Sequence, residues 1–270
     1  MSKVKTRGKN AIYVGAAVAS AVIGLLINIA INTPSSAWGA SDSPVRQGLF
    51  LMNVLLIFDI PAVLGILMFK NHSEWLAQPG KYVESVKYSL LSPYTLTASA
   101  VIAAVAVVAG IPGPLNIDTV ALVTAFAAVF FGPVVAFVGA FVAFILRYML
   151  GLAPFVPAPT VMFLDALMDG GIWAVNATIF WFVIRGLKGT MKSVMTIVMA
   201  FVFMAIHFLG WGIAYYFTLN PYPAAVADFL FAITPPTGFF ISSWVAQFFG
   251  TLVAAFYYDT RLLLGSVKRQ

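Results

Sequence analysis

The chain has 270 residues, of which 61% are hydrophobic and only 9% are charged. Soluble domains carry about 25% charged residues, and a soluble fold of this length has too much surface to hide so many apolar side chains. Its apolar runs of about 20 residues also exclude a transmembrane barrel, whose strands alternate apolar and polar residues. The composition therefore predicts an all-α integral membrane protein.

The sequence contains no motif for the common kinds of catalysis or metal binding. It has no Cys, which excludes disulfides and thiolate metal ligands. HExxH, GxSxG and Walker-type lysine loops are also absent. We therefore expect a protein that is not an enzyme and that holds no metal or cofactor. The net charge of +6 does not indicate a nucleic-acid partner, because the basic residues lie in short loops between apolar segments.

The first apolar stretch follows a basic tail, as it does in a signal peptide. Ala37-Trp38-Gly39-Ala40 offers a small-residue cleavage site. However, the apolar run of residues 11–31 is longer than a signal core, which has about 7–15 residues. We therefore expect this run to be retained as the first membrane helix.

Eight segments have about the length and apolarity that a spanning helix needs, which is roughly 20 residues. The fourth is short, and Gly132-Pro133 after it predicts a turn between two helices, because Gly favours a helix end and Pro a first helical turn. The eight predicted spans are residues 12–31, 48–69, 93–110, 118–131, 133–152, 160–185, 192–219 and 235–258.

The distribution of Lys and Arg predicts the orientation in the membrane, since cytoplasmic loops are enriched in both. With eight spans, the basic residues of four loops and tails fall on one side, and only Arg46 and Arg147 do not belong to that set. We therefore expect a multi-pass protein of the cell membrane with both termini in the cytoplasm. The residues on the cytoplasmic side are Lys3, Lys5, Arg7, Lys9, Lys70, Lys81, Lys87, Arg185, Lys188, Lys192, Arg261, Lys268 and Arg269.

The longest polar interruption, residues 70–92, is the best candidate for a boundary within the chain. It divides the chain into an N-terminal transmembrane hairpin (residues 1–70), a cytoplasmic loop (71–92) and a six-helix membrane body (93–270). Part of the loop has the aromatic residues of a surface amphipathic helix, Trp75, Tyr82 and Tyr88, and a plain loop fits equally well.

Several polar and aromatic residues of the six-helix body are candidates for a binding site. Ionisable groups within membrane spans are costly and usually functional. Asp165 and Asp169 are four residues apart and share a helix face, which Trp173 and Asn176 continue. His207 and Trp211 are spaced in the same way, and Trp244 and Gln247 are three residues apart. Asp118 and Arg147 lie near the outer ends of their spans.

Each of these residues also has a structural interpretation. Arg147 could form an ion pair with Asp165 or Asp118, and His207 could be a satisfied core group. Trp211 and Trp244 could belong to the interfacial aromatic belt. Asp59, next to Pro61, could cap a helix break or contact a partner. Taken together, the polar and aromatic groups predict an outward-facing pocket for a small molecule, and the scarcity of positive groups favours a neutral or cationic solute that contains a ring.

The third predicted span carries small residues at a spacing of four, which allows close helix approach. These residues are Ser99, Ala100, Ala103 and Ala104. They predict either a docking face for a partner membrane subunit or close packing within the chain.

From about residue 88 onward, the chain resembles the S-component of an energy-coupling factor (ECF) transporter. One motif that carries the resemblance is the alanine-rich stretch of residues 97–110 with its Pro/Gly outer loop. A second is DTVALVTAFAAVFFGPVVAFVGAFVAFILRYMLG at residues 118–151, with its Gly-Pro turn and closely spaced small residues. The third is DGGIWAVNATIFWFVIRG at residues 169–186. The first ninety residues depart from the family pattern.

The resemblance implies a protein that captures a vitamin-like small molecule outside the cell. A transmembrane coupling subunit would dock on the alanine-rich helix, and a pair of cytoplasmic ATPases would drive import. The pocket residues that the resemblance implies are Asn116, Asp118, Asp169, Trp173, Asn176, His207, Trp211, Trp244 and Gln247. Two alternatives remain open at this stage: a non-catalytic structural subunit of a larger membrane complex, and a secondary transporter that uses Asp165 or Asp169.

Overall fold

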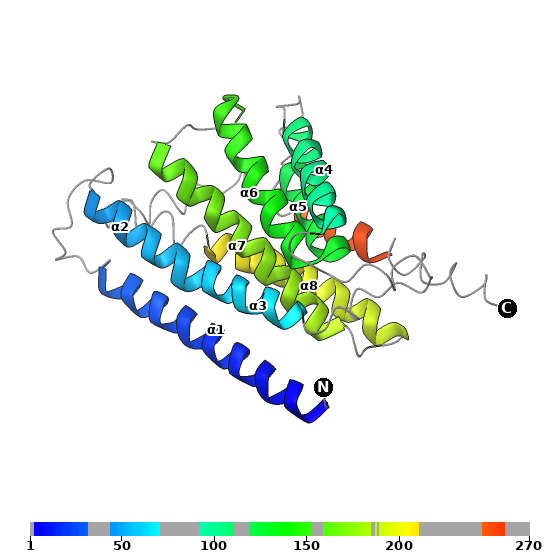
Figure 1. Cartoon of the computed structure of the whole chain (residues 1–270). Coiled ribbons are helices and arrows are strands. Elements are labelled where there is room, and N and C mark those ends of the chain that lie inside the picture. Colours follow the sequence, from blue (N-terminus) through cyan, green and yellow to red (C-terminus); the bar gives the residue numbers. More distant parts are fainter. Residues whose placement is uncertain are drawn as a thin grey trace.

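A computed structural model describes residues 3–31, 44–70, 92–110, 119–152, 159–184, 187, 189–210 and 245–256. Every regular element in these residues is a helix (Figure 1). A final helical segment, Val245–Phe256, carries no label. The labelled helices are α1 (Lys3–Ile31), α2 (Pro44–Asn53), η1 (Val54–Asp59), α3 (Ile60–Lys70), α4 (Pro93–Ala109), α5 (Thr119–Phe131), α6 (Pro133–Met149), α7 (Pro159–Ile184) and α8 (Gly189–Gly210).

The described helices have the length and apolarity of an α-helical membrane protein, and the number of eight spans stays a prediction. Four stretches are long and apolar enough to cross a bilayer: Gly8–Ala30, Pro44–Phe69, Val161–Ile184 and Gly189–His207. α2, η1 and α3 together form the second of these. The described residues also contain four shorter apolar helices: Pro93–Ala109, Val120–Phe131, Pro133–Met149 and Val245–Phe256. In every predicted span, all or nearly all of the described residues are therefore helical.

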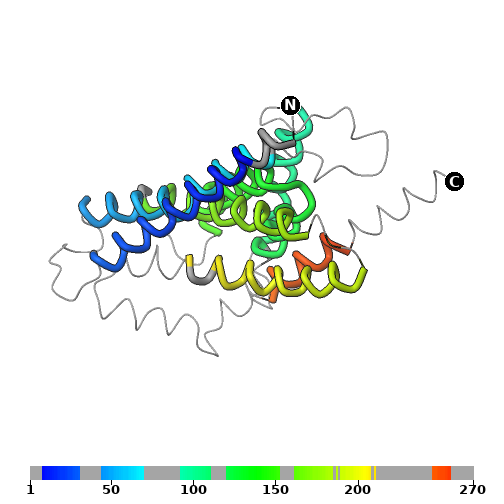
Figure 2. The backbone as a smooth tube through the Cα atoms, turned by 90° about the horizontal axis from the view of Figure 1, so that it is seen from below, coloured from blue at the N-terminus to red at the C-terminus, as the bar shows by residue number. Residues whose placement is uncertain are grey.

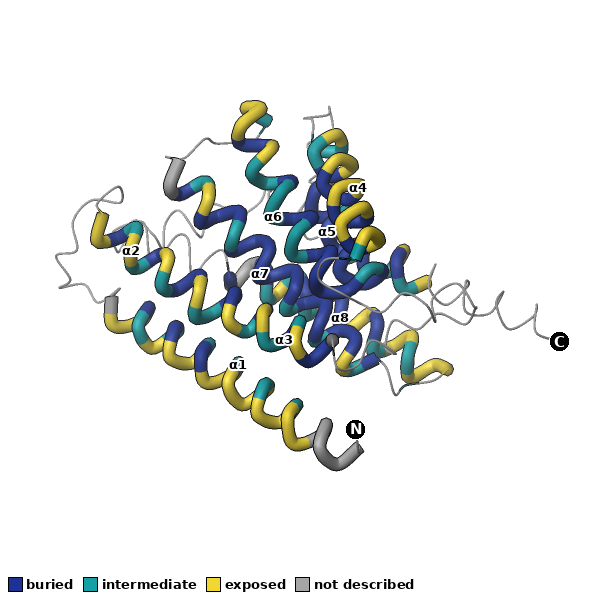
Figure 3. Tube along the Cα trace, viewed as in Figure 1, coloured by how far each residue is buried: buried dark blue, intermediate teal, exposed yellow. Residues whose placement is uncertain are grey.

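The outermost and the most central helix differ sharply in burial. Only 11% of the most apolar window of Gly8–Ala30 is buried within the protein, against 72% for Val161–Ile184. In Figure 3, α1 is largely exposed while much of α7 is buried. The exposed side chains of α1 are apolar, for example Ile12 and Ile29. Such a surface is stable in contact with lipid and costly in contact with water.

α7 is the helix around which the others are arranged. It packs against α6, α8, α5, α3 and η1. Figure 2 shows α1 and α2 on one side of the molecule and α8 on the other, with Val245–Phe256 beside α8. Gly170 allows a close approach of α6, because a Cβ atom there would lie 3.0 Å from the backbone oxygen of Phe137. Small residues at helix contacts are the usual means of tight packing in membranes.

The predicted turn at Gly132-Pro133 is confirmed. α5 ends at Phe131, Gly132 has a φ of +85°, and Pro133 is the first residue of α6. A residue with a side chain rarely adopts this positive φ, whereas Gly does so at little cost. Pro133 has no N–H to leave unsatisfied in the first helical turn.

The second membrane stretch contains a π-helical turn, η1, that Pro61 explains. The N–H of Ile60 bonds to the carbonyl of Leu55, five residues back. The next bond in this pattern would run from residue 61 to the carbonyl of Leu56, but Pro61 has no N–H. The hydroxyl of Ser20 in α1 donates to the Leu56 carbonyl instead, at 2.7 Å. α1 thus satisfies a backbone group that would otherwise lack a partner in the membrane.

The N-terminal hairpin packs directly onto α7. Gly65 of α3 faces Thr178, since a Cβ atom on Gly65 would lie 2.6 Å from the Thr178 hydroxyl oxygen. Gly171 faces η1, where its Cβ would lie 2.6 Å from a carboxylate oxygen of Asp59. The proposed division into residues 1–70, 71–92 and 93–270 stays a prediction, and residues 71–91, with the possible surface helix, lie outside the described residues.

Replacing Ser20 with Ala should lower stability by about 1 kcal/mol, because the Leu56 carbonyl loses its donor in an apolar environment. Thermal unfolding in mild detergent would measure the change. Ser99→Ala is the matched control, since the buried Ser99 hydroxyl has no hydrogen-bond partner among the described residues. Equal destabilisation by the two substitutions would contradict this account of η1.

Candidate functional site

One face of α7 carries a stripe of polar and aromatic residues. Asp165, Asp169, Trp173 and Asn176 follow one another at spacings of four, four and three, so they lie on one side of the helix. All four are completely buried. Since a buried polar group without a partner is costly in an apolar environment, the surroundings of this stripe determine what it does.

A chain of hydrogen bonds joins α7, α8 and the C-terminal helical segment. Nε2 of His207 lies 3.1 Å from Oδ1 of Asp169. The side-chain amide of Gln247 is hydrogen-bonded to Nδ1 of His207. The amide nitrogen of Gln247 can only donate, so Nδ1 accepts and the ring proton of a neutral His207 lies on Nε2, from which it donates to Asp169. These two hydrogen bonds fix the positions of α7, α8 and the C-terminal helical segment relative to one another.

The indole of Trp173 lies against this network. Its ring centroid is 5.3 Å from that of His207 and 6.4 Å from that of Phe203, which it meets edge to face. Phe180 continues the same aromatic wall, with its centroid 6.0 Å from that of Phe203. The network is therefore bounded on one side by flat, apolar rings.

Apart from the carboxylates, three polar side-chain atoms in the stripe have no hydrogen-bond partner among the described residues. They are Nε1 of Trp173 and both the oxygen and the nitrogen of the Asn176 amide. Buried polar atoms in proteins are nearly always hydrogen-bonded, so such exceptions call for an explanation. Together they offer two donor nitrogens and one acceptor oxygen next to aromatic rings, which is the arrangement expected of a site for a small polar ring compound.

A second polar group lies at the start of the stripe. The Tyr148 hydroxyl of α6 donates to Oδ2 of Asp165. Arg147 is close enough to Asp165 for their charges to attract. Arg147 also lies beside the end of α4, where a Cβ atom on Gly110 would be 2.9 Å from its Nε. A positive charge at a helix C-terminus is stabilising, so the structure favours a structural role for Arg147.

The structure brings together part of the predicted set. Asp169, Trp173, His207 and Gln247 form one cluster, with Asn176 a turn away on the same face of α7. Asp165 and Arg147 are neighbours, as one of the two suggested ion pairs requires, and the other suggested partner, Asp118, lies outside the described residues. The predicted residues outside the described ranges are Asn116, Asp118, Trp211 and Trp244.

Two residues of the site were missed by sequence reasoning. Tyr148 is the partner of Asp165, and Phe203 is part of the aromatic wall. The position of Tyr148 beside Arg147 near the end of a span was an available signal. Phe203 is four residues before His207 and so shares its helix face, but Phe is common in membrane helices and the spacing alone is weak.

The small residues of α4 fall into two pairs with different surroundings. Ser99 and Ala103 are buried. Next to them, α4 and α6 approach each other closely, because a Cβ atom on Gly139 of α6 would lie 2.7 Å from Ile102. This pair serves packing within the chain. Ala100 and Ala104 are exposed on the outer face of α4. Only the second pair is accessible to a partner subunit in this structure.

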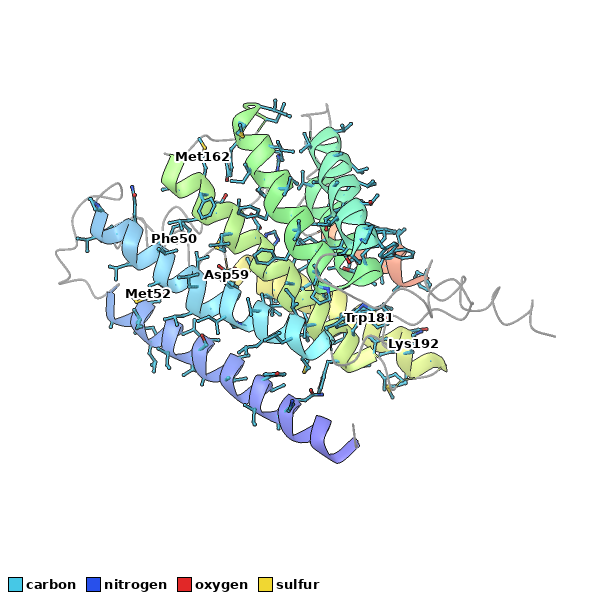
Figure 4. All side chains as sticks on the ribbon, viewed as in Figure 1. Phe50, Met52, Asp59, Met162, Trp181 and Lys192 are labelled. Atoms are coloured by element: carbon cyan, nitrogen blue, oxygen red, sulfur yellow. The ribbon has the colours of Figure 1, made fainter. Side chains whose placement is uncertain are left out.

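Asp59 is a buried carboxylate apart from the stripe, on the helix next to α7 (Figure 4). Neither of its oxygens has a hydrogen-bond partner among the described residues. It therefore does not cap a helix break, as one interpretation of the Asp59–Pro61 pair held. It packs against Gly171 on the side of α7 opposite to Asp169.

Comparison with known proteins adds no relative: no family model matches the chain, and neither a curated protein nor a solved structure matches it.

The contact between Tyr148 and Asp165 should contribute about 0.5–2 kcal/mol, the range for buried side-chain hydrogen bonds in membrane proteins. A double-mutant cycle with Tyr148→Phe and Asp165→Asn measures it by reversible unfolding in detergent. We expect a coupling energy within this range, with Tyr148→Phe costing less once Asp165 is Asn. Strict additivity of the two substitutions would show that the contact is not energetically significant.

Proposed function

We propose that this protein is the substrate-capturing membrane subunit, or S-component, of an ECF-type ATP-driven importer for a vitamin-like small molecule. The observation that carries the proposal is the set of buried polar atoms on Trp173 and Asn176 that have no partner among the described residues. They lie beside a hydrogen-bonded network that joins three helical segments. A solute that hydrogen-bonds to these atoms and stacks on the indole accounts for their burial.

The surroundings favour a neutral or cationic solute that contains a ring. Asp169 places a carboxyl group at the centre of the cluster, and Trp173 and Phe203 supply flat apolar faces. Arg147, the positive side chain near Asp165, has its Nε beside Gly110 at the end of α4. Aromatic walls attract cations as well as neutral rings, whereas an anion would meet the Asp169 carboxylate.

The proposed orientation places the beginning of the polar stripe in the outer half of the membrane, whereas Trp173 and Asn176, further along α7, lie beyond the midplane. Eight spans with cytoplasmic termini put the beginning of α7 at the outer surface. Asp169 lies ten residues from that beginning, or about 15 Å along the helix, which is half of a hydrocarbon core of about 30 Å. A solute can then reach the cluster from outside without crossing the whole bilayer.

The proposed partners are a transmembrane coupling subunit and a pair of cytoplasmic ATPases, since the chain itself has no Walker loop. The exposed pair Ala100 and Ala104 on α4 is the proposed contact with the coupling subunit. Small side chains four residues apart allow the backbones of two membrane helices to approach closely.

A secondary transporter is the second candidate function, and the two buried carboxylates one turn apart favour it. Asp165 and Asp169, with His207 next to the latter, could carry a coupling proton. Solute counterflow in liposomes that contain only this protein, lost on Asp169→Asn, would support that function over the ECF-type importer.

Removing the unsatisfied polar atoms should weaken solute binding without harming the fold. Mass spectrometry of purified protein identifies the retained solute, and a thermal-shift panel of vitamins and nucleobases measures its affinity. We expect Trp173→Phe and Asn176→Leu each to weaken binding at least about tenfold, since each removes a hydrogen bond to the solute in a dry site. Neither substitution breaks a hydrogen bond among the described residues.

Trp181→Phe is the matched control for this experiment. The Trp181 indole N–H donates to the backbone oxygen of Val129 at 2.9 Å, so its loss should lower stability and leave solute affinity unchanged. A protein that retains no small molecule and responds to none in the panel would contradict the proposed function. Unchanged affinity in both Trp173→Phe and Asn176→Leu would contradict the proposed site.

The docking role of α4 has its own test. Ala100→Trp should reduce co-purification of the ATPase pair at least about tenfold, because a large side chain prevents close helix approach, and solute affinity should not change. Ala19→Trp, on the exposed face of α1, is the control and should leave co-purification intact. If both variants retained the ATPases, the coupling subunit would not dock on this face.

A further inference from the structure

The N-terminal hairpin and α7 enclose a cavity of about 340 Å³ that the proposed solute site does not use. Its walls are formed by residues 13–21 of α1, residues 57–68 of η1 and α3, and residues 175–182 of α7. On α7 these are positions opposite to Trp173, because Val175 is two residues, or about 200°, further around the helix. The cavity and the polar stripe therefore lie on different sides of α7.

The cavity is long and narrow. At 1.5 Å per residue, its walls extend about 10 to 16 Å along the three helices. A volume of about 340 Å³ over that length is well below the roughly 1,000 Å³ that a helix with its side chains fills. A helix has a diameter of about 10–12 Å and cannot enter, whereas one hydrocarbon chain can.

The close contacts of α1 define both ends of the cavity. At one end α1 is tightly packed, since a Cβ atom on Gly24 would lie 2.5 Å from Cγ1 of Ile57, and Ser20 bonds to Leu56. At the other end Tyr13 packs against the core cluster that contains Met68. Between these two contacts the space lies between α1 and α7, and α3, against which both of them pack, forms its floor.

The wall of the cavity is apolar. Tyr13 and Thr178 bring the only side-chain oxygens among its lining residues, and the Thr178 hydroxyl donates to the backbone oxygen of Ala174 at 2.9 Å. A polar solute would lose its hydration in such a cavity without gaining partners. The occupant must therefore be hydrocarbon over most of its length.

The mouth of the cavity opens toward the surroundings of the helix bundle. Val14, Val18 and Phe182 line the cavity and are each about half exposed. The same exposed surface of α1 is apolar along its length and faces lipid in a membrane protein. An occupant can enter sideways from the bilayer without crossing a polar barrier.

We propose that this cavity binds one acyl chain of an anionic phospholipid from the leaflet at the N-terminal end of α1. Lys9, which is exposed, lies one helical turn before Tyr13 at the end of the cavity. A basic residue at that level attracts a lipid phosphate, while the chain extends along α1 toward Gly24. The lipid would hold the hairpin against α7, on the side of α7 away from the solute cluster.

The test uses the full chain in phosphatidylcholine nanodiscs that contain a small fraction of phosphatidylglycerol with a photoactivatable diazirine on its acyl chain. Crosslinks should map to cavity residues of α1, α3 and α7 and should saturate with the labelled lipid. Ala17→Phe fills the cavity from α1 and should reduce this labelling at least about fivefold, because several methylenes lose their contacts. Ala16→Phe, on the exposed side of α1, should not reduce it.

The remaining outcomes also decide the question. If Ala17→Phe does not fold, Ala21→Phe fills the same cavity one turn further along and replaces it. Labelling spread evenly over all lipid-facing helices, or equal labelling of Ala17→Phe and Ala16→Phe, would overturn the site. Lys9→Gln should lower the preference for phosphatidylglycerol over phosphatidylcholine about fivefold, and an unchanged preference would overturn the choice of headgroup. None of these results depends on whether Trp173 and Asn176 bind a solute.

Discussion

The structure depends on the need to satisfy polar side chains on α7, a helix that is mostly buried in an apolar environment. Asp165 and Asp169 lie on α7 with no exposed surface. Each recruits a donor from a different element: Tyr148 from α6 for the first, and His207 from α8 for the second. Gln247 then joins the C-terminal helical segment to His207. The hydrogen bonds thus specify which helices surround α7, a choice that apolar packing in lipid leaves open, because lipid is as apolar as the helices.

The same constraint acts on the backbone in the N-terminal hairpin. Pro61 removes a donor from the helix, and the π-helical turn before it shifts the unsatisfied carbonyl to Leu56. Ser20 satisfies that carbonyl and so ties α1 to η1 at one point. Gly24, one turn away, allows the close approach this bond requires. α1 packs along α3 but does not pack against α7, and the apolar cavity lies between these two helices.

Local signals in the sequence were sufficient for the helices but not for their partners. The Gly132-Pro133 turn follows from the backbone chemistry of two residues, and the shared face of Asp165, Asp169, Trp173 and Asn176 follows from helical spacing. The pairing of Asp165 with Tyr148, by contrast, depends on how α6 and α7 cross, which spacing within one helix does not specify. For the same reason the four small residues of α4 could not be divided in advance into a buried and an exposed pair.

The arrangement also gives the N-terminal hairpin, which departs from the family that the rest of the chain resembles, a physical role. α7 has two faces that need different neighbours. Its polar face contacts α8 and the C-terminal segment, while the face with Gly171, Val175 and Thr178 contacts the hairpin. Since both faces belong to one helix about 10 Å wide, a ligand that moves α7 on one side alters the packing on the other. Solute and lipid, if each prefers one position of α7, must then change each other's affinity by the same factor.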